Sequence, residues 1–180
     1  MEQIKTGYLE IILGSMYSGK TSRLVEIYKQ CQFCNISVIV INHIIDNRYD
    51  DNLMSTHDQI KIPCLKTENL LDLQANIRSD VILINEGQFF LDLEEFVEKM
   101  LAQKKKIYIC GLDGDFERKK FGQILNLIPL CDKVTKLTSL CSLCKNGTPG
   151  IFSKRITSEK EQTVVGCDNY IPVCRSCYES

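Results

Sequence analysis

The sequence has no long apolar run, no excess of charge of one sign and no internal repeat. Its longest apolar stretches, Val38–Ile41 and Val81–Ile84, have the length of strands, whereas a membrane-spanning helix needs about 20 apolar residues. The net charge of −1 gives no general attraction to a polyanion, so a small-molecule substrate is favoured over nucleic acid. The first residues lack the layout of a secretory signal, and we expect a cytoplasmic protein with no membrane partner.

The 180 residues have room for one well-buried domain and a small appendage. Three apolar stretches, at 37–41, 80–85 and 106–110, are rich in β-branched residues and typical of strands buried on both faces of a parallel sheet. Helical spacing of apolar residues occurs at 20–33 and 92–102. This alternation predicts an α/β fold with a doubly wound, mainly parallel sheet.

A glycine-rich turn joins the first apolar stretch, 7–13, to the helix predicted from Lys20. The turn matches the Walker A pattern through Gly14, Ser15, Met16, Tyr17, Ser18, Gly19, Lys20 and Thr21. In such a loop backbone N–H groups converge on phosphate oxygens, Lys20 reaches the β and γ phosphates, and the Thr21 hydroxyl can bind Mg²⁺. We therefore predict an ATP site, rather than a simple glycine-containing turn.

An acid follows the second long apolar stretch. Asn85 and Glu86 stand where the Walker B position of a nucleotide-binding sheet lies beside the phosphate loop. We predict that Glu86 is the general base, because a kinase must remove a proton from its acceptor oxygen. The alternative is that Glu86 merely begins a turn at Gly87.

Ten cysteines form three C-x-x-C pairs, where chance predicts roughly half of one pair. Two of the pairs, Cys141/Cys144 and Cys174/Cys177, make a set that would close tetrahedrally around Zn²⁺ with no open position, which indicates a structural site. The alternative is four thiols packed by coincidence. The other six are predicted to pack as ordinary thiols: Cys31, Cys34, Cys64, Cys110, Cys131 and Cys167.

Five segments resemble the zinc-containing P-loop family of thymidine kinases. They are GSMYSGKT, NEGQFF, GLDGDFERKKFGQILNL, KLTSLCSLC and NYIPVCRSCY, and the resemblance runs in order from Tyr8 to Tyr178. It implies ATP-dependent phosphorylation of thymidine to thymidine monophosphate, with Mg²⁺ bound to the substrate and Zn²⁺ in a structural role. It also implies a homotetramer and feedback inhibition by thymidine triphosphate.

The resemblance also assigns residues to the two substrates. Glu86 would accept the 5′-hydroxyl proton, while Arg48, in the polar segment 42–59, would face the transferring phosphate, with Asn85 also in the ATP site. The residues that it places against the nucleoside are Met16, Phe89, Leu112, Phe116, Phe121, Ser153, Val164, Gly166 and Tyr170. By residue type alone, Phe116 and Phe121 fit a core equally well, and Arg48 fits a solvated loop. The polar segment itself predicts an extended excursion or a hairpin.

We expect residues 1–138 to form the P-loop domain and residues 139–180 to form a zinc-bearing lobe. Within the lobe, 145–172 resembles the family's lasso loop, which covers the base. The sequence departs from the family where Asn85 replaces the usual Asp, where 145–151 is lengthened, and where Ser153 replaces Thr. The first change removes a carboxylate from the Mg²⁺ surroundings, and the last keeps a hydroxyl.

Two other functions match parts of the pattern. A P-loop ATPase that contacts nucleic acid through the four-cysteine module would show DNA-stimulated hydrolysis and no labelled nucleotide product. A zinc-centred interaction module that only senses nucleotide would bind ATP without turnover. The length of the family resemblance favours the kinase.

Overall fold

The computed structural model describes residues 6–46, 53–55, 60–164 and 169–180. Its central sheet consists of β1 (Tyr8–Gly14), β2 (Val38–His43), β5 (Leu65–Thr67), β6 (Val81–Ile84), β7 (Lys106–Gly111) and β8 (Lys133–Leu137). The spatial order is β5-β2-β6-β7-β1-β8, and every neighbouring pair is parallel. The predicted parallel sheet is confirmed, and its parallel register brings the carboxyl ends of the strands to one edge.

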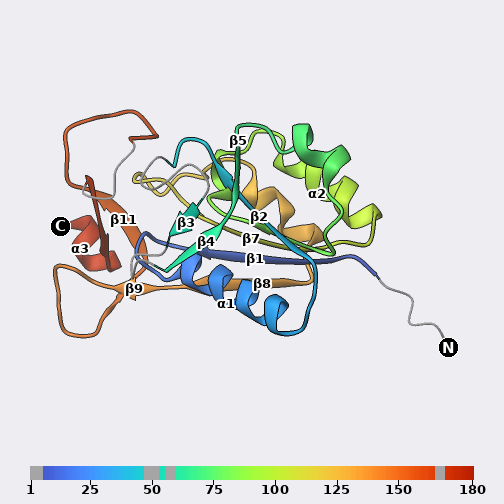
Figure 1. Ribbon diagram of the computed structural model, residues 1–180. Helices are drawn as coiled ribbons and strands as arrows, with labels where there is room; N and C mark the ends of the chain where they lie inside the picture. Colours follow the sequence, from blue (N-terminus) through green and yellow to red (C-terminus); the bar gives the residue numbers. More distant parts are fainter. Residues whose placement is uncertain (1–5, 47–52, 56–59, 165–168) are drawn as a thin grey trace.

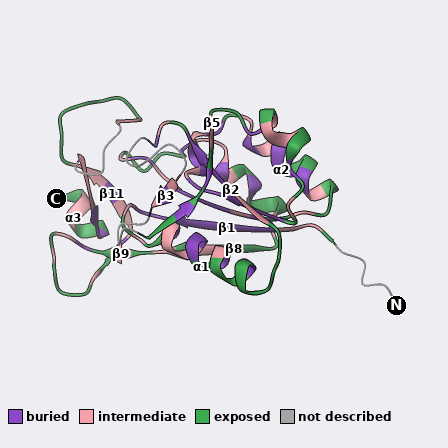
Figure 2. Cartoon of the chain, in the orientation of Figure 1, coloured by how far each residue is buried: buried purple, intermediate pink, exposed green. Residues whose placement is uncertain are grey.

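Helices cover both faces of the sheet (Figure 1). Helix α1 (Lys20–Phe33) packs on one face, and α2 (Leu93–Ala102) packs on the other together with the 3₁₀ helices η1 (Leu71–Asn76) and η3 (Ile124–Leu130). Neighbouring residues of β1 serve opposite faces, because strand side chains alternate: Ile11 joins the core beneath α2, and Ile12 joins the core beneath α1. The sheet is thus buried on both sides, as Figure 2 shows, and the doubly wound fold is confirmed.

The thiols outside the four-cysteine set mostly pack as predicted. Cys31, Cys64 and Cys110 are buried, and Cys131 is half-buried. Cys34 is exposed, so its predicted core position is wrong. It lies just beyond the last residue of α1, where the chain has left the face that packs on the sheet. Cys167 lies outside the described residues.

The polar segment after β2 leads into a small hairpin. Strands β3 (Leu53–Ser55) and β4 (Lys61–Pro63) pair antiparallel, and Met54 and Ile62 pack into the core beneath α1. The hairpin predicted for 42–59 is therefore shifted along the chain, because β3 lies within that segment and β4 follows it. Arg48 lies outside the described residues.

In its described residues, the C-terminal part contains four short strands and a helix. They are β9 (Ser139–Leu140), β10 (Pro149–Gly150), β11 (Phe152–Arg155), β12 (Tyr170–Val173) and α3 (Arg175–Glu179). The pairs β9–β10 and β11–β12 are antiparallel, and Val173 and Cys174 centre a separate small core. Helix α3 has only five residues, too few to give a helical period in the sequence. A domain boundary at 138 stays a prediction. Across the described ranges, every helix is too short or too polar to cross a membrane.

Candidate nucleotide-binding site

A pocket lies at the carboxyl edge of the sheet, where ligands bind in open α/β folds. With its open mouth included it holds about 1040 Å³. Lys20 and Glu86 both line it, so the phosphate loop and the predicted base face the same space. The predicted site residues in its wall are Met16, Tyr17, Ser18, Gly19, Lys20, Thr21, Glu86, Phe89, Leu112, Phe116, Phe121, Ser153, Val164 and Tyr170.

The phosphate loop packs closely against the end of β8 and is bonded to its own lysine. A Cβ atom at Gly14 would lie 2.4 Å from the carbonyl oxygen of Leu137, so the loop can pass this point only with glycine. The Lys20 ammonium donates a hydrogen bond to the carbonyl oxygen of Ser15 at 2.7 Å, which folds the lysine over the loop. Gly14 and Ser15 do not line the pocket, and both hold the phosphate loop in its conformation.

The C-terminal part binds directly to the phosphate loop. The Ser15 hydroxyl donates to the carbonyl oxygen of Gly150 at 2.8 Å, and the Met16 N–H donates to the hydroxyl oxygen of Ser153 at 3.0 Å. Ser153 is buried, so this bond is shielded from water. The Ser153 hydroxyl, a group that threonine would also supply, therefore has a definite partner, and strand β11, which carries Ser153, is bonded to the phosphate loop.

Glu86 has an unusual backbone conformation. Its φ of 53° and ψ of 43° are left-handed, a region that residues other than glycine enter rarely and at some free-energy cost. It caps the short helix η2 (Gly87–Phe89), so it does begin a turn, yet its side chain still lines the pocket. Strain of this kind is common where a side chain must be aimed at a ligand.

Gln88 holds the Glu86 carboxylate in place. Its amide nitrogen donates to Oε2 of Glu86 at 2.7 Å, and its amide oxygen accepts from the Leu112 N–H at 3.1 Å. Only 2% of Gln88 is exposed, so both bonds lie away from bulk water. The residue assignments from the sequence missed Gln88, although the NEGQFF segment contains it.

A chain of side-chain amides lies beneath the phosphate loop. Oδ1 of Asn85 accepts from the Thr21 hydroxyl at 3.4 Å and from the Cys110 thiol at 3.0 Å. The Asn85 amide nitrogen donates to Asn42, whose own amide donates to the carboxylate of Asp46, both at 3.1 Å. Burial raises the pKa of Cys110 to about 12, so this thiol keeps its proton and remains a donor. Asn85 lies behind the pocket, whereas Asp46, absent from the sequence assignments, lines it.

Aromatic rings form one wall of the pocket. The ring centroids of Phe89 and Phe121 are 5.5 Å apart and the rings are nearly perpendicular, while His43 lies 5.6 Å from Phe89. Burial lowers the pKa of His43, so the ring is held neutral among these neighbours. Phe121 is 8% exposed, which makes it at once a core residue and part of the wall.

The opposite wall comes from the C-terminal part. Val164 and Tyr170 both line the pocket, and the Tyr170 hydroxyl lies 3.3 Å from the carbonyl oxygen of Val164. Two further pocket residues, Asp115 and Gln162, were not predicted from the sequence. Gly166 lies outside the described residues, as does Arg48.

The four predicted zinc ligands meet in space. One ligand atom from each of Cys141, Cys144, Cys174 and Cys177 lies within 4.8 Å of the others. Backbone N–H groups, that of Cys144 foremost, lower the pKa of Cys141 to about 6. The neighbouring thiols raise the pKa of Cys144 to about 12. A bound cation would let all four be thiolates, so this donor set fits a metal such as zinc.

Comparison with known proteins agrees with this geometry. The family model described as thymidine kinase matches residues 7–178. The chain belongs to the thymidine kinase family. A thymidine kinase from Yaba monkey tumor virus is 42% identical over 97% of this chain and 96% of its own length.

Members from distant sources align as fully with this chain. The Sheeppox virus thymidine kinase is 42% identical over 96% of this chain and 97% of its own. Thymidine kinase 1 of Dictyostelium discoideum is 39% identical over 97% of this chain and 78% of its own. Among solved structures, domain III of the Thermotoga maritima replication initiation protein DnaA aligns over 76% of this chain and 57% of its own, with a TM-score of 0.45 and 17% identity.

Proposed function

We propose that this protein is a thymidine kinase, which transfers the γ-phosphate of ATP to the 5′-hydroxyl of thymidine and releases thymidine monophosphate. The observation that carries the proposal is that Lys20 and Glu86 line one pocket, which also has an aromatic wall that includes Phe89 and Phe121. Family membership and the names of relatives at about 40% identity support the same substrate pair. Neither a nucleic-acid-stimulated ATPase nor an inactive zinc module is favoured.

The phosphate side of the pocket stabilises negative charge. Loop N–H groups and the start of α1 surround the phosphates, and Lys20 exchanges its Ser15 carbonyl partner for phosphate oxygens when ATP binds. Mg²⁺ has oxygen donors available in the Thr21 hydroxyl and the Asp46 carboxylate, which is the donor type that it prefers. When bound, the ion neutralises charge on the β and γ phosphates. Asn85 then orients Thr21 without adding a charge.

Glu86 acts as the general base on the nucleoside side. Its carboxylate accepts the 5′-hydroxyl proton as the oxygen attacks the γ-phosphorus, and Gln88 keeps the acceptor oxygen aimed. Much of the rate enhancement comes from holding ATP and the nucleoside next to each other in one pocket. We also propose that Arg48 places a positive charge beside the phosphate that is transferred.

The base lies between the aromatic wall and the C-terminal loop. Flat apolar surfaces such as those of Phe89 and Phe121 suit a nucleobase. Backbone groups near Val164 and Gly166 supply donors and acceptors for its polar edge. Zn²⁺ held by the four cysteines would tie the chain after β9 to the start of α3 and so would anchor both ends of the segment 145–172.

The assembly and its regulation complete the proposal. We expect a cytoplasmic homotetramer that thymidine triphosphate inhibits. Size-exclusion chromatography with light scattering tests the tetramer, and initial rates at rising thymidine triphosphate test the inhibition.

The decisive experiment identifies the product. Purified protein is incubated with ATP, Mg²⁺ and each deoxynucleoside separately, and thymidine monophosphate is the expected product. Glu86→Gln should lower kcat by at least about 100-fold, within the range for loss of a general base. Glu117→Gln, which removes an exposed carboxylate paired with Lys119, is the matched control and should retain wild-type kcat. Turnover by Glu86→Gln within a few-fold of wild type would refute the assignment.

A further inference from the structure

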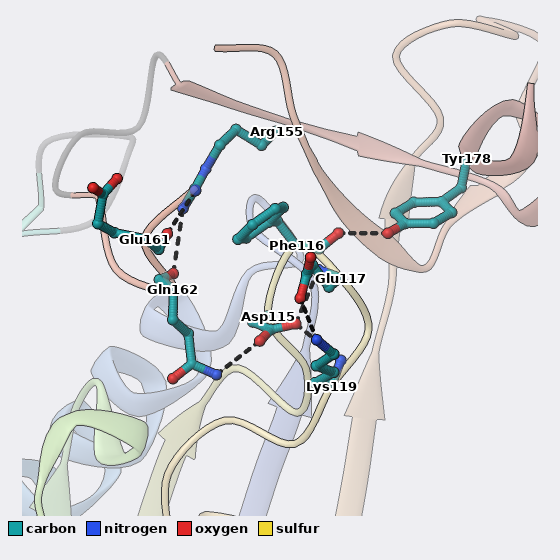
Figure 3. Close-up of polar contacts among 8 residues, drawn as sticks. All are labelled: Asp115, Phe116, Glu117, Lys119, Arg155, Glu161, Gln162 and Tyr178. Carbon is teal, nitrogen blue, oxygen red and sulfur yellow. Dashed lines mark hydrogen bonds and ion pairs between the residues drawn. The ribbon is translucent and has the colours of Figure 1, made fainter. Parts of the chain in front are cut away.

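The segment 156–164, called here the covering loop, follows β11 in the connection to β12 and has little packing of its own. Residues 156–162 are exposed, and only the end of the loop, at Gln162, Thr163 and Val164, lines the pocket. A segment with so few buried contacts is held in place by the particular bonds that it makes. Most of its side-chain bonds converge on Arg155 and Asp115 (Figure 3), while the Tyr170 hydroxyl bonds to Val164 at the end of the loop.

Arg155 forms hydrogen bonds with the backbone of the covering loop. Its guanidinium donates to the carbonyl oxygens of Glu159 at 2.9 Å, Glu161 at 2.6 Å and Gln162 at 3.3 Å. The same guanidinium lies 3.8 Å from the ring centroid of Phe116, a residue of the pocket wall. The backbone of the covering loop is therefore bonded to the Arg155 guanidinium, which in turn stacks on the Phe116 ring in the pocket wall.

Asp115 reaches the covering loop from the other side of the pocket. Its Oδ1 accepts from the N–H groups of Glu117 and Lys119, both at 2.9 Å, which rigidifies its own turn. Its Oδ2 accepts from the Gln162 amide at 2.7 Å. Only 6% of Asp115 is exposed. One oxygen of its carboxylate is held by its own turn, and the other oxygen bonds to the covering loop.

We propose that Asp115 and Gln162 are positioning residues for the nucleoside, a role that rests on the proposed function. Their hydrogen bond closes the covering loop across the pocket and, together with the bonds between Val164 and the Tyr170 hydroxyl, sets the position of Val164. Because the acceptor is charged and the bond is half-buried, it is stronger than an ordinary amide contact. Neither side chain touches the reacting atoms, so the bond should govern nucleoside binding more than phosphoryl transfer.

Introducing a like charge at Gln162 tests this bond without removing either side chain. Gln162→Glu places two carboxylates against each other, and the like charges should force the loop open. The KM for thymidine should rise about 10-fold, while kcat and the KM for ATP stay within about 3-fold. Adding Asp115→Asn supplies an amide donor to the new carboxylate and keeps the oxygen that accepts from Glu117 and Lys119, so the double variant should return to within about 3-fold of wild type.

Lys160→Gln is the matched control, because it changes the net charge of the exposed loop by the same amount and leaves the bond intact. It should keep the wild-type KM for thymidine. Amide hydrogen exchange of 156–164 gives a readout that needs no activity: exchange should quicken about 10-fold in Gln162→Glu and slow again in the double variant.

Two results would overturn the proposal. One is a Gln162→Glu variant with wild-type KM and exchange. The other is a double variant no better than the single one, since independent effects would simply add. Failure of wild-type protein to phosphorylate thymidine would instead contradict the proposed function, and the exchange data would still decide whether the bond closes the loop.

Discussion

Gln88 offers the sharpest test of how the fold aims its catalytic carboxylate. In Gln88→Met a side chain of similar length fills the same space, but the bonds to Glu86 and to the Leu112 N–H are both lost. Leaving a buried N–H without a partner costs about 1 to 3 kcal/mol, and the Leu112 N–H is only half-buried, so we expect the free energy of unfolding to fall by about 1 kcal/mol. Urea denaturation measures this change.

Activity should fall much further than stability alone requires. Without the Gln88 amide, the Glu86 carboxylate loses the bond that fixes its Oε2 atom, and a misplacement of about 1 Å can reduce a rate about 100-fold. We therefore expect kcat for thymidine phosphorylation to drop between about 10- and 100-fold at a temperature where the variant is fully folded. The KM for ATP should change little, since Gln88 makes no contact with the phosphate loop.

Gln123 supplies the control for this experiment. Its amide also bridges two backbone groups, because it donates to the carbonyl oxygen of Leu91 at 2.5 Å and accepts from the N–H of Glu94 at 3.1 Å. It does not line the pocket. Gln123→Met should therefore lose stability and keep its kcat. If Gln88→Met kept kcat within about twofold, or if Gln123→Met lost as much, the proposed aiming of Glu86 would be wrong.

Two further predictions concern the metal and pH. Cys177→Ser should abolish the binding of one zinc per chain, measured by atomic absorption, and lower Tm by more than about 5 °C, whereas Cys34→Ser should change neither. Burial lowers the pKa of His43 in the folded protein. Below about pH 6.5 the unfolded chain therefore binds more protons at His43 than the folded protein does. The free energy of unfolding should consequently fall as pH drops from about 7 to 5, and a His43→Gln variant with the same pH dependence as wild type would contradict this.

The sequence determined the elements that depend on local pattern. Continuous β-branched residues in β2, β6 and β7 predicted strands buried on both faces, since such strands have no polar side to show. The phosphate loop was also evident, because its chemistry requires particular residues at adjacent positions. The four-cysteine set needed only its spacing, as each pair spans one metal-binding turn.

Tertiary structure alone decided how distant residues are aimed. Gln88, Asp115 and Gln162 carry no local pattern that separates them from ordinary polar residues, and the bonds that define their roles join them to residues far along the chain. The Gln162 amide meets a carboxylate 47 positions away only because β7 and the covering loop end at the same pocket. A hydrogen bond depends on distance and direction in space, and a sequence records neither until the sheet is folded.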